Sequence, residues 1–202
     1  MNQKSQKTFD LQGPSDLLEK LRYDIMRLKR ARSSSELRYA AFDCAIGAWH
    51  MVDWLLAAIS PSRQGYLTRT GTKIRSQGFI TLNEDRLPGI RECQAVANSG
   101  KHRILTIMPD DPSLSARTTV RFDRPLDEGD VHTGQFPKPH PAAYISKGDQ
   151  KIDAVVFFTT LERAWRKVLV EEGCLPPHVQ SREIDHALWY SYSLNDYYWE
   201  NE

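Results

Sequence analysis

The chain has 202 residues and a net charge of +1, and its 40% apolar and 26% charged residues are ordinary values for a soluble globular protein. This length suits a single domain, residues 1–202, with one sizeable core. The polar N-terminus has no signal-peptide pattern, and charged residues interrupt the most apolar run, Tyr39–Ile59, so we expect a cytoplasmic protein with no membrane partner.

Charge is unevenly distributed along the chain. Residues 1–105 contain 17 Lys and Arg against 10 Asp and Glu, a balance of +7, whereas residues 106–202 have a balance of −6. The basic half could attract a polyanion, although charge scatter on solvated helix faces explains the split equally well. The three cysteines, Cys44, Cys93 and Cys174, form no CxxC pair. Cys44 and Cys93 lie in apolar helical surroundings, and we expect them to be buried free thiols in a reducing compartment.

Two helices are predicted in the first third of the chain. Residues 13–32 begin with a Pro-Ser-Asp capping signal and repeat apolar residues at helical spacing, namely Leu17, Leu18, Leu21, Ile25 and Leu28. Residues 33–60 predict a second helix, which Ser34 or Ser35 can cap and Pro61 ends. Because this helix is apolar almost all round, we expect it to be buried, with its Asp43, His50 and Asp53 facing partners or a cavity.

The centre of the chain predicts a connection and then a third helix. Residues 61–84 are rich in Gly, Ser, Thr and Arg and predict a long connection, which can include a short helix or turn. Residues 85–105 predict the third helix, with Pro88 near its first turn and Pro109 beyond its end.

The last part of the chain changes in character at Pro109. Residues 109–151 predict a β-containing insertion, in which alternating segments at 115–126 and 142–151 flank a Pro/Gly loop. Residues 153–173 predict a fourth helix, and the aromatic, acidic tail 178–202 is expected to pack on the body or on a partner. The predicted fold is therefore mainly α, a four-helix up-and-down bundle with a small β-hairpin ornament between the third and fourth helices.

The polar residues of the second and third predicted helices form the candidate catalytic site, which comprises His50, Asp53, Asn98, Lys101 and His102. In a bundle, inward-facing side chains of two such helices can share a pocket. An imidazole beside a carboxylate suits general acid–base chemistry, and a nearby Lys can stabilise negative charge on a phosphorane or an oxyanion. We predict no cofactor, since the sequence contains no phosphate-binding glycine loop and no nucleophile elbow.

Three alternatives to this catalytic interpretation stay open. His50 and Asp53 could be a buried polar pair that only fixes helix register. Asn-Ser-Gly at residues 98–100 could end the third helix, which would leave Lys101 and His102 as ordinary residues beyond it. His50, Asp53 and His102 could instead hold a metal ion, although no HxxxH or HxH spacing supports this.

The arrangement of four helices with a polar-x-x-x-His step near the end of the third resembles the HEPN superfamily of all-α domains. Many members are dimeric, metal-independent ribonucleases of toxin–antitoxin and phage-defence systems, with a motif of Arg, a polar residue, three residues and His. Asn98 and His102 match the last two positions, whereas Ala97 occupies the arginine position. The resemblance covers residues 15–108 and the fourth helix. The stretches at 40–54 and 93–102 also resemble a group of bacterial proteins with no established activity.

Two hypotheses for function follow from the residues and the resemblance. In the first, a HEPN-like protein binds RNA through its basic half and cleaves it, with His102 as acid–base, Asn98 positioning the strand and Lys101 opposing phosphate charge. In the second, the chain is a non-catalytic module that forms a homodimer or binds a cognate antitoxin or another protein, and the polar cluster only specifies the core.

Overall fold

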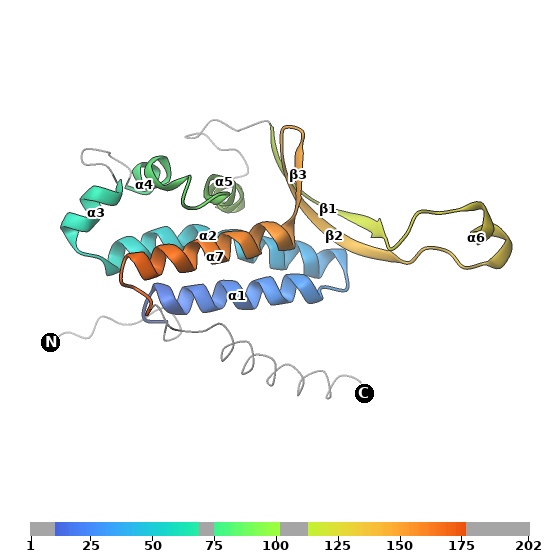
Figure 1. The fold of residues 1–202 in the computed structure, drawn as a ribbon, viewed down its shortest axis with the longest axis horizontal. Coiled ribbons are helices and arrows are strands. Elements are labelled where there is room, and N and C mark those ends of the chain that lie inside the picture. The colour runs from blue at the N-terminus through green and yellow to red at the C-terminus, as the bar shows by residue number, and fades with distance from the viewer. Residues whose placement is uncertain (1–10, 69–74, 102–112, 177–202) are drawn as a thin grey trace, which may run out of the picture.

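The protein is mainly helical and carries one small antiparallel sheet (Figure 1). The computed structural model describes residues 11–68, 75–101 and 113–176. The helices are α1 (Pro14–Arg30), α2 (Ser34–Ala58), α3 (Pro61–Thr68), α4 (Arg75–Asn83), α5 (Ile90–Lys101), α6 (Glu128–Thr133) and α7 (Ala154–Glu171). The strands are β1 (Leu114–Phe122), β2 (Pro139–Lys147) and β3 (Gln150–Asp153). The predicted mainly α class is confirmed.

The core lies where α1, α2 and α7 pack along one another, with α5 on a further side of α2. The predicted apolar stripe of α1 is confirmed, because its five members are all buried in this core. On α7, Trp165 is fully buried and stacks on Phe79 of α4 with a ring separation of 6.0 Å. The long helices are therefore joined by continuous apolar packing, which provides most of their stability.

Local sequence signals set the ends of the long helices. Ser33, rather than Ser34 or Ser35, caps α2 by accepting a hydrogen bond from the backbone N–H of Glu36, whose carboxylate returns to the Ser33 N–H. Asp153 caps α7, since its carboxylate accepts from the N–H groups of Val155 and Val156. Gly173 follows α7 with a φ of +71°, as expected for the residue that ends a helix.

The predicted connection at residues 61–84 folds into two short helices, α3 and α4, around the undescribed residues 69–74. Pro61 does not end α2, which stops at Ala58, but opens α3 at its first position. Leu67, Phe79 and Ile80 anchor the two helices, because each is buried in the core. The segment is polar in composition, and tertiary packing of these few apolar residues makes it helical.

The predicted β-containing insertion is confirmed as a three-stranded antiparallel sheet in the order β1-β2-β3. Its inner end packs on α2 and α7, and its outer end projects from the helices as an arm that carries α6 at its tip (Figure 1). Thr118 faces Ala143 in the β1–β2 register, and Ile145 faces Ile152 in the β2–β3 register. The fold thus joins a compact helical body to an extended hairpin.

Candidate functional site

The predicted site residues of α2 lie in different surroundings. Asp43 accepts a hydrogen bond from Arg27 Nη1 at 2.9 Å, and Arg27 also contacts the buried Asp24, so Asp43 links α2 to α1. His50 is half-buried. Asp53 is exposed and lines a shallow hollow with the residues that open α1. Asp43 is therefore part of a structural ion pair, and Asp53 lies in a solvent-exposed depression.

The predicted site residues of α5 lie at the end of that helix. Asn98 is half-buried, and Lys101 is the last residue of α5. The described helix continues through Gly100 to Lys101, one residue beyond the Asn-Ser-Gly at which the alternative ends it. His102, the proposed acid–base, lies outside the described residues, as does the aromatic tail.

The structure does not bring Asn98 and Asp53 together. Asn98 lines a large pocket with Arg38–Ala45 of α2, whereas Asp53 lines a separate hollow with Gln12 and Pro14. At about 1.5 Å per residue, Asp53 lies roughly 12 Å farther along α2 than Ala45. The prediction of one shared cleft is wrong for this pair, because the end of α5 lies against the beginning of α2.

The large pocket, of about 840 Å³, is formed by α2, α5, β1, β2 and the start of α7. Its buried floor is apolar and comprises Ala45, Ala143, Ile145, Ala154 and Phe158. Around the opening lie the polar side chains of Arg38, Tyr39, Asn98, Ser99, Arg117 and Thr118. An apolar floor with a few polar groups at the opening is typical of ligand-binding pockets, which span about 300–1,000 Å³.

Two of the four cations that line this pocket are neutralised by neighbouring carboxylates. Lys147 Nζ lies 2.8 Å from Glu92 Oε1, which joins β2 to α5. Arg91 Nη2 lies 2.7 Å from Glu84 Oε2, and this hydrogen-bonded guanidinium lowers the pKa of Glu84. Neither pair leaves net charge in the pocket.

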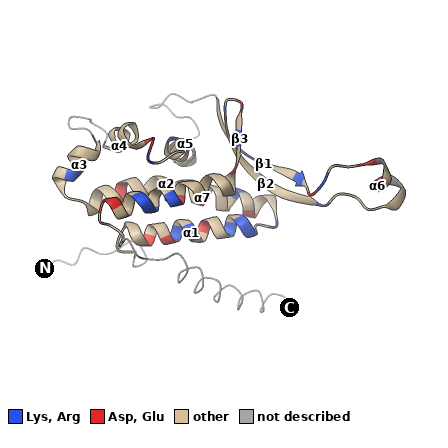
Figure 2. Cartoon of the chain, viewed as in Figure 1, with Lys and Arg blue, Asp and Glu red and all other residues tan. Residues whose placement is uncertain are grey.

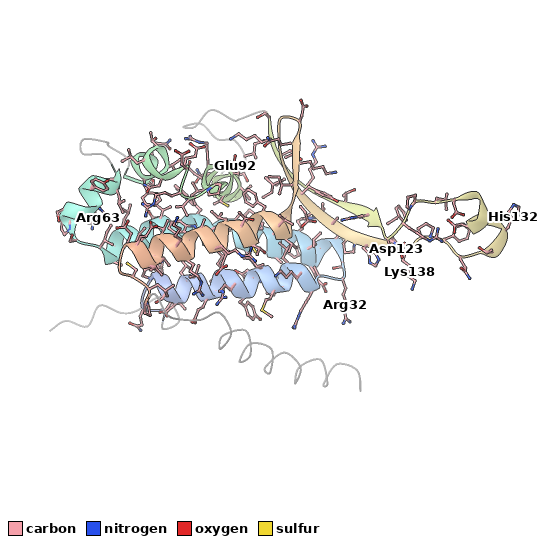
Figure 3. All side chains as sticks on the ribbon, viewed as in Figure 1. Arg32, Arg63, Glu92, Asp123, His132 and Lys138 are labelled. Atoms are coloured by element: carbon pink, nitrogen blue, oxygen red, sulfur yellow. The ribbon has the colours of Figure 1, made fainter. Side chains whose placement is uncertain are left out.

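Six exposed cations differ from these, because none of their side chains has an acidic partner in the part of the chain that the structure describes. They are Lys29, Arg32, Arg38, Arg117, Arg121 and Lys138. The backbone N–H groups of Arg32 and Lys138 donate to the carboxylates of Glu36 and Asp123, but their charged groups do not. They occur at the turn between α1 and α2, on β1 and at the beginning of β2 (Figure 2). Figure 3 shows Arg32 at the end of the helical body near the root of the arm, with Lys138 farther out on the arm. We call these six residues the cationic corner.

The sequence analysis missed the cationic corner, although its pattern is visible. In β1, Arg117 and Arg121 share one face of the strand, while Leu114, Val120 and Phe122 share the other. Arg121 faces His140 across the β1–β2 pair, which adds an imidazole to the same face. This alternation of basic and apolar positions predicts a strand with one cationic face.

Thiol and metal chemistry find no support in the described residues. Burial raises the pKa of the Cys44 and Cys93 thiols, so neither forms the thiolate that a nucleophile requires. Both are free and buried, as predicted. No group of three His, Cys, Asp or Glu side chains within residues 11–68, 75–101 and 113–176 is placed to hold a metal ion.

Comparisons with known proteins found no match to this chain. No family model, no curated protein and no solved structure matches it. Among the described helices, none is long and apolar enough to cross a membrane.

Proposed function

We propose that this protein is a cytoplasmic, HEPN-like RNA-binding domain of the toxin or phage-defence type, in which α1, α2, α5 and α7 form the family's four-helix bundle. The cationic corner carries this proposal. Six exposed cations whose side chains have no acidic partner among the described residues provide a surface for the phosphates of a polyanion. Such contacts gain free energy by releasing counterions from the nucleic acid.

The electrostatics favour a polyanion over an ordinary solvated surface. Elsewhere in the described chain, cations such as Arg63, Arg86 and Arg124 are held by carboxylates at 2.5–2.6 Å. Arg117 and Arg121 instead share one face of β1 with hydroxyl side chains. An array of unpaired cations is costly to keep together unless an anion neutralises it, which supports a bound polyanion.

Binding is tested with a fluorescein-labelled single-stranded RNA of mixed sequence, by anisotropy at several NaCl concentrations. We expect the affinity to fall with salt, with a slope of about −0.7 per phosphate contact. The double variant Arg121→Ala/Lys138→Ala should flatten that slope by about 1–1.5. Arg163→Ala, an exposed cation of α7, is the matched control and should leave the slope unchanged. A wild-type protein that does not bind RNA at low salt contradicts the proposal.

RNA cleavage is the catalytic extension of this proposal. It assigns His102 as acid–base, Asn98 to positioning and Lys101 to charge stabilisation, with the strand's own 2′-hydroxyl attacking its phosphate. Wild type and His102→Ala are incubated with total RNA in EDTA. Cleavage by wild type alone supports a ribonuclease, and intact RNA in both samples leaves a binding domain without this activity.

Self-association through the arm is a second candidate function, and the exposed apolar face of the arm favours it. Val120, Phe122, Leu126 and Phe136 are all exposed, and β1 is paired on one side only among the described strands. An antiparallel β1–β1 pair centred on Thr118 would place Leu114 opposite Phe122 of the second copy, and Ala116 opposite Val120. The same register places both arginines opposite hydroxyl residues, so no like charges meet.

Light scattering after size exclusion tests this second candidate. Lysine in an edge strand disfavours pairing between copies, so Val120→Lys is expected to dissociate such a dimer. Val156→Lys, at an exposed valine of α7, is the matched control. A wild-type protein that is monomeric at 100 µM (about a hundredfold above the range used for RNA binding) contradicts association through β1.

A further inference from the structure

The large pocket offers a second kind of contact to RNA, and Asn98, which the cleavage hypothesis assigns to positioning, lies in its lining. Its floor lies between α2, α5 and the inner end of the sheet, and it is apolar and buried. The cationic corner supplies two of its lining residues, Arg38 and Arg117, one from each side. An apolar cavity is thus bordered by the same unpaired charge that supports RNA binding.

The opening of the pocket also presents a free aromatic ring. Tyr39 is 62% exposed, and Phe42 lies one helical turn farther along α2 in the same lining. Exposed aromatic rings beside cations are the usual platform for unpaired bases, because every base has a face that can stack. A tyrosine that held only the core together would be buried instead.

The backbone of β1 adds hydrogen-bonding groups to the pocket. Its five consecutive residues Leu114–Thr118 all line the cavity. Side chains of a strand alternate between two faces, so backbone atoms of these successive residues also border the cavity. Among the described strands, β1 has a partner only at β2, which leaves the N–H and C=O groups of its other edge available to base edges.

We propose that this pocket binds unpaired bases of single-stranded RNA, with Tyr39 stacking on a base and Arg38 and Arg117 binding the flanking phosphates. This inference rests on the proposed RNA binding and adds the form of RNA that is recognised. Paired bases are stacked inside a duplex and cannot enter a pocket, whereas splayed bases of a single strand can. The protein therefore prefers single-stranded over double-stranded RNA.

The test compares a single-stranded RNA with a duplex of the same sequence. Tyr39→Ala removes the stacking ring, and because Tyr39 is largely exposed, the fold does not depend on it. Ala95→Trp places a large side chain in the pocket from α5. Each variant is expected to lose about 10-fold or more in affinity for the single strand, with duplex affinity unchanged. Circular dichroism confirms that each variant is folded.

Tyr66→Ala is the matched control for loss of a tyrosine, since Tyr66 is exposed on α3, away from the pocket lining. It should bind as wild type does. If both pocket variants bind the single strand normally, the pocket inference is overturned, while salt-dependent binding through Arg121 and Lys138 still supports the proposed function. If wild type binds no RNA, both the pocket inference and the proposed function are contradicted. A dimer that either pocket variant dissociates, with RNA affinity unchanged, overturns the inference in favour of a second copy of the chain at the pocket.

Discussion

Replacement of Gly89 by alanine tests how the start of α5 is held against α7. Gly89 lies directly before α5 and has a φ of +94°, a conformation that residues with a side chain rarely adopt. A Cβ at this position would lie 2.4 Å from Cζ of Phe157. That ring is buried and packs edge-on against Phe158 at 5.1 Å, so it has little room to move away.

The expected loss of stability combines three contributions. Positive φ costs an alanine about 1–2 kcal/mol. The contact with Phe157 adds about 1–3 kcal/mol for an overpacked core. Alanine also lowers the conformational entropy of the unfolded chain, which raises the free energy of unfolding by about 0.4–1 kcal/mol. We therefore expect Gly89→Ala to lower the free energy of unfolding by about 2–4 kcal/mol, out of the roughly 5–15 kcal/mol typical of a domain.

Gly134→Ala separates backbone strain from steric contact. Gly134 has a φ of +70°, and a Cβ there would have no neighbour within 4 Å, so this variant should lose about 1 kcal/mol or less. Urea unfolding followed by circular dichroism gives both values. The double variant Gly89→Ala/Phe157→Leu should recover part of the loss if the ring is its cause. Equal stability of Gly89→Ala and Gly134→Ala would refute the close approach of the α5 start to α7.

Two further predictions concern the ends of α7. Glu172→Gln should lower the melting temperature by several degrees, because Glu172 is a buried carboxylate 2.6 Å from Arg63 Nε and 3.2 Å from Arg86 Nη2. Since Arg63, and then Arg86, lower the pKa of Glu172, wild type should lose this stabilisation as the pH falls below about 4.3, whereas the variant should lose less. Asp153→Ala removes the α7 cap and should cost about 1 kcal/mol in urea unfolding, and Asp153→Asn should retain most of it.

The long helices could be predicted from the sequence because each buries an apolar stripe at helical spacing. The stripe of α1 and the helix at residues 153–173 match the observed elements to within two residues at each end. The insertion was predicted in the same way, since β1 alternates between apolar and polar positions except at Thr118. Where the local pattern of apolar residues agrees with their burial in the fold, the sequence is sufficient to predict the element.

The short helices α3 and α4 could not be predicted, because their stability depends on partners far along the chain. Phe79 is buried by stacking on Trp165, which lies 86 positions later in the sequence. Arg63 and Arg86 bind Glu172, and these ion pairs attach α3 and the turn that follows α4 to the end of α7. From the sequence alone, a segment with few apolar residues is predicted to be a connection, because the distant residues that bury it as a helix are not known.

The candidate site shows the same limit of local pattern. Asp53 lies on α2 and Asn98 on α5, but which polar residues meet depends on the position of α5 along α2. Because the end of α5 lies against Arg38–Ala45, Asn98 reaches the large pocket and not Asp53. No periodicity within one helix specifies that register between two helices.

The two candidate functions compete for the same strand edge. A β1–β1 pair would use the backbone groups of Leu114–Thr118 that also line the pocket, and it would cover the opening beside Arg117. Each strand edge can be satisfied by one partner at a time, so a bound RNA strand and a second copy exclude each other there. The charge of β1 separates the two: hydroxyl residues of a second copy could accept hydrogen bonds from Arg117 and Arg121 but would not neutralise their charge, whereas phosphates would do both. The unpaired arginines therefore favour RNA at this edge over self-association.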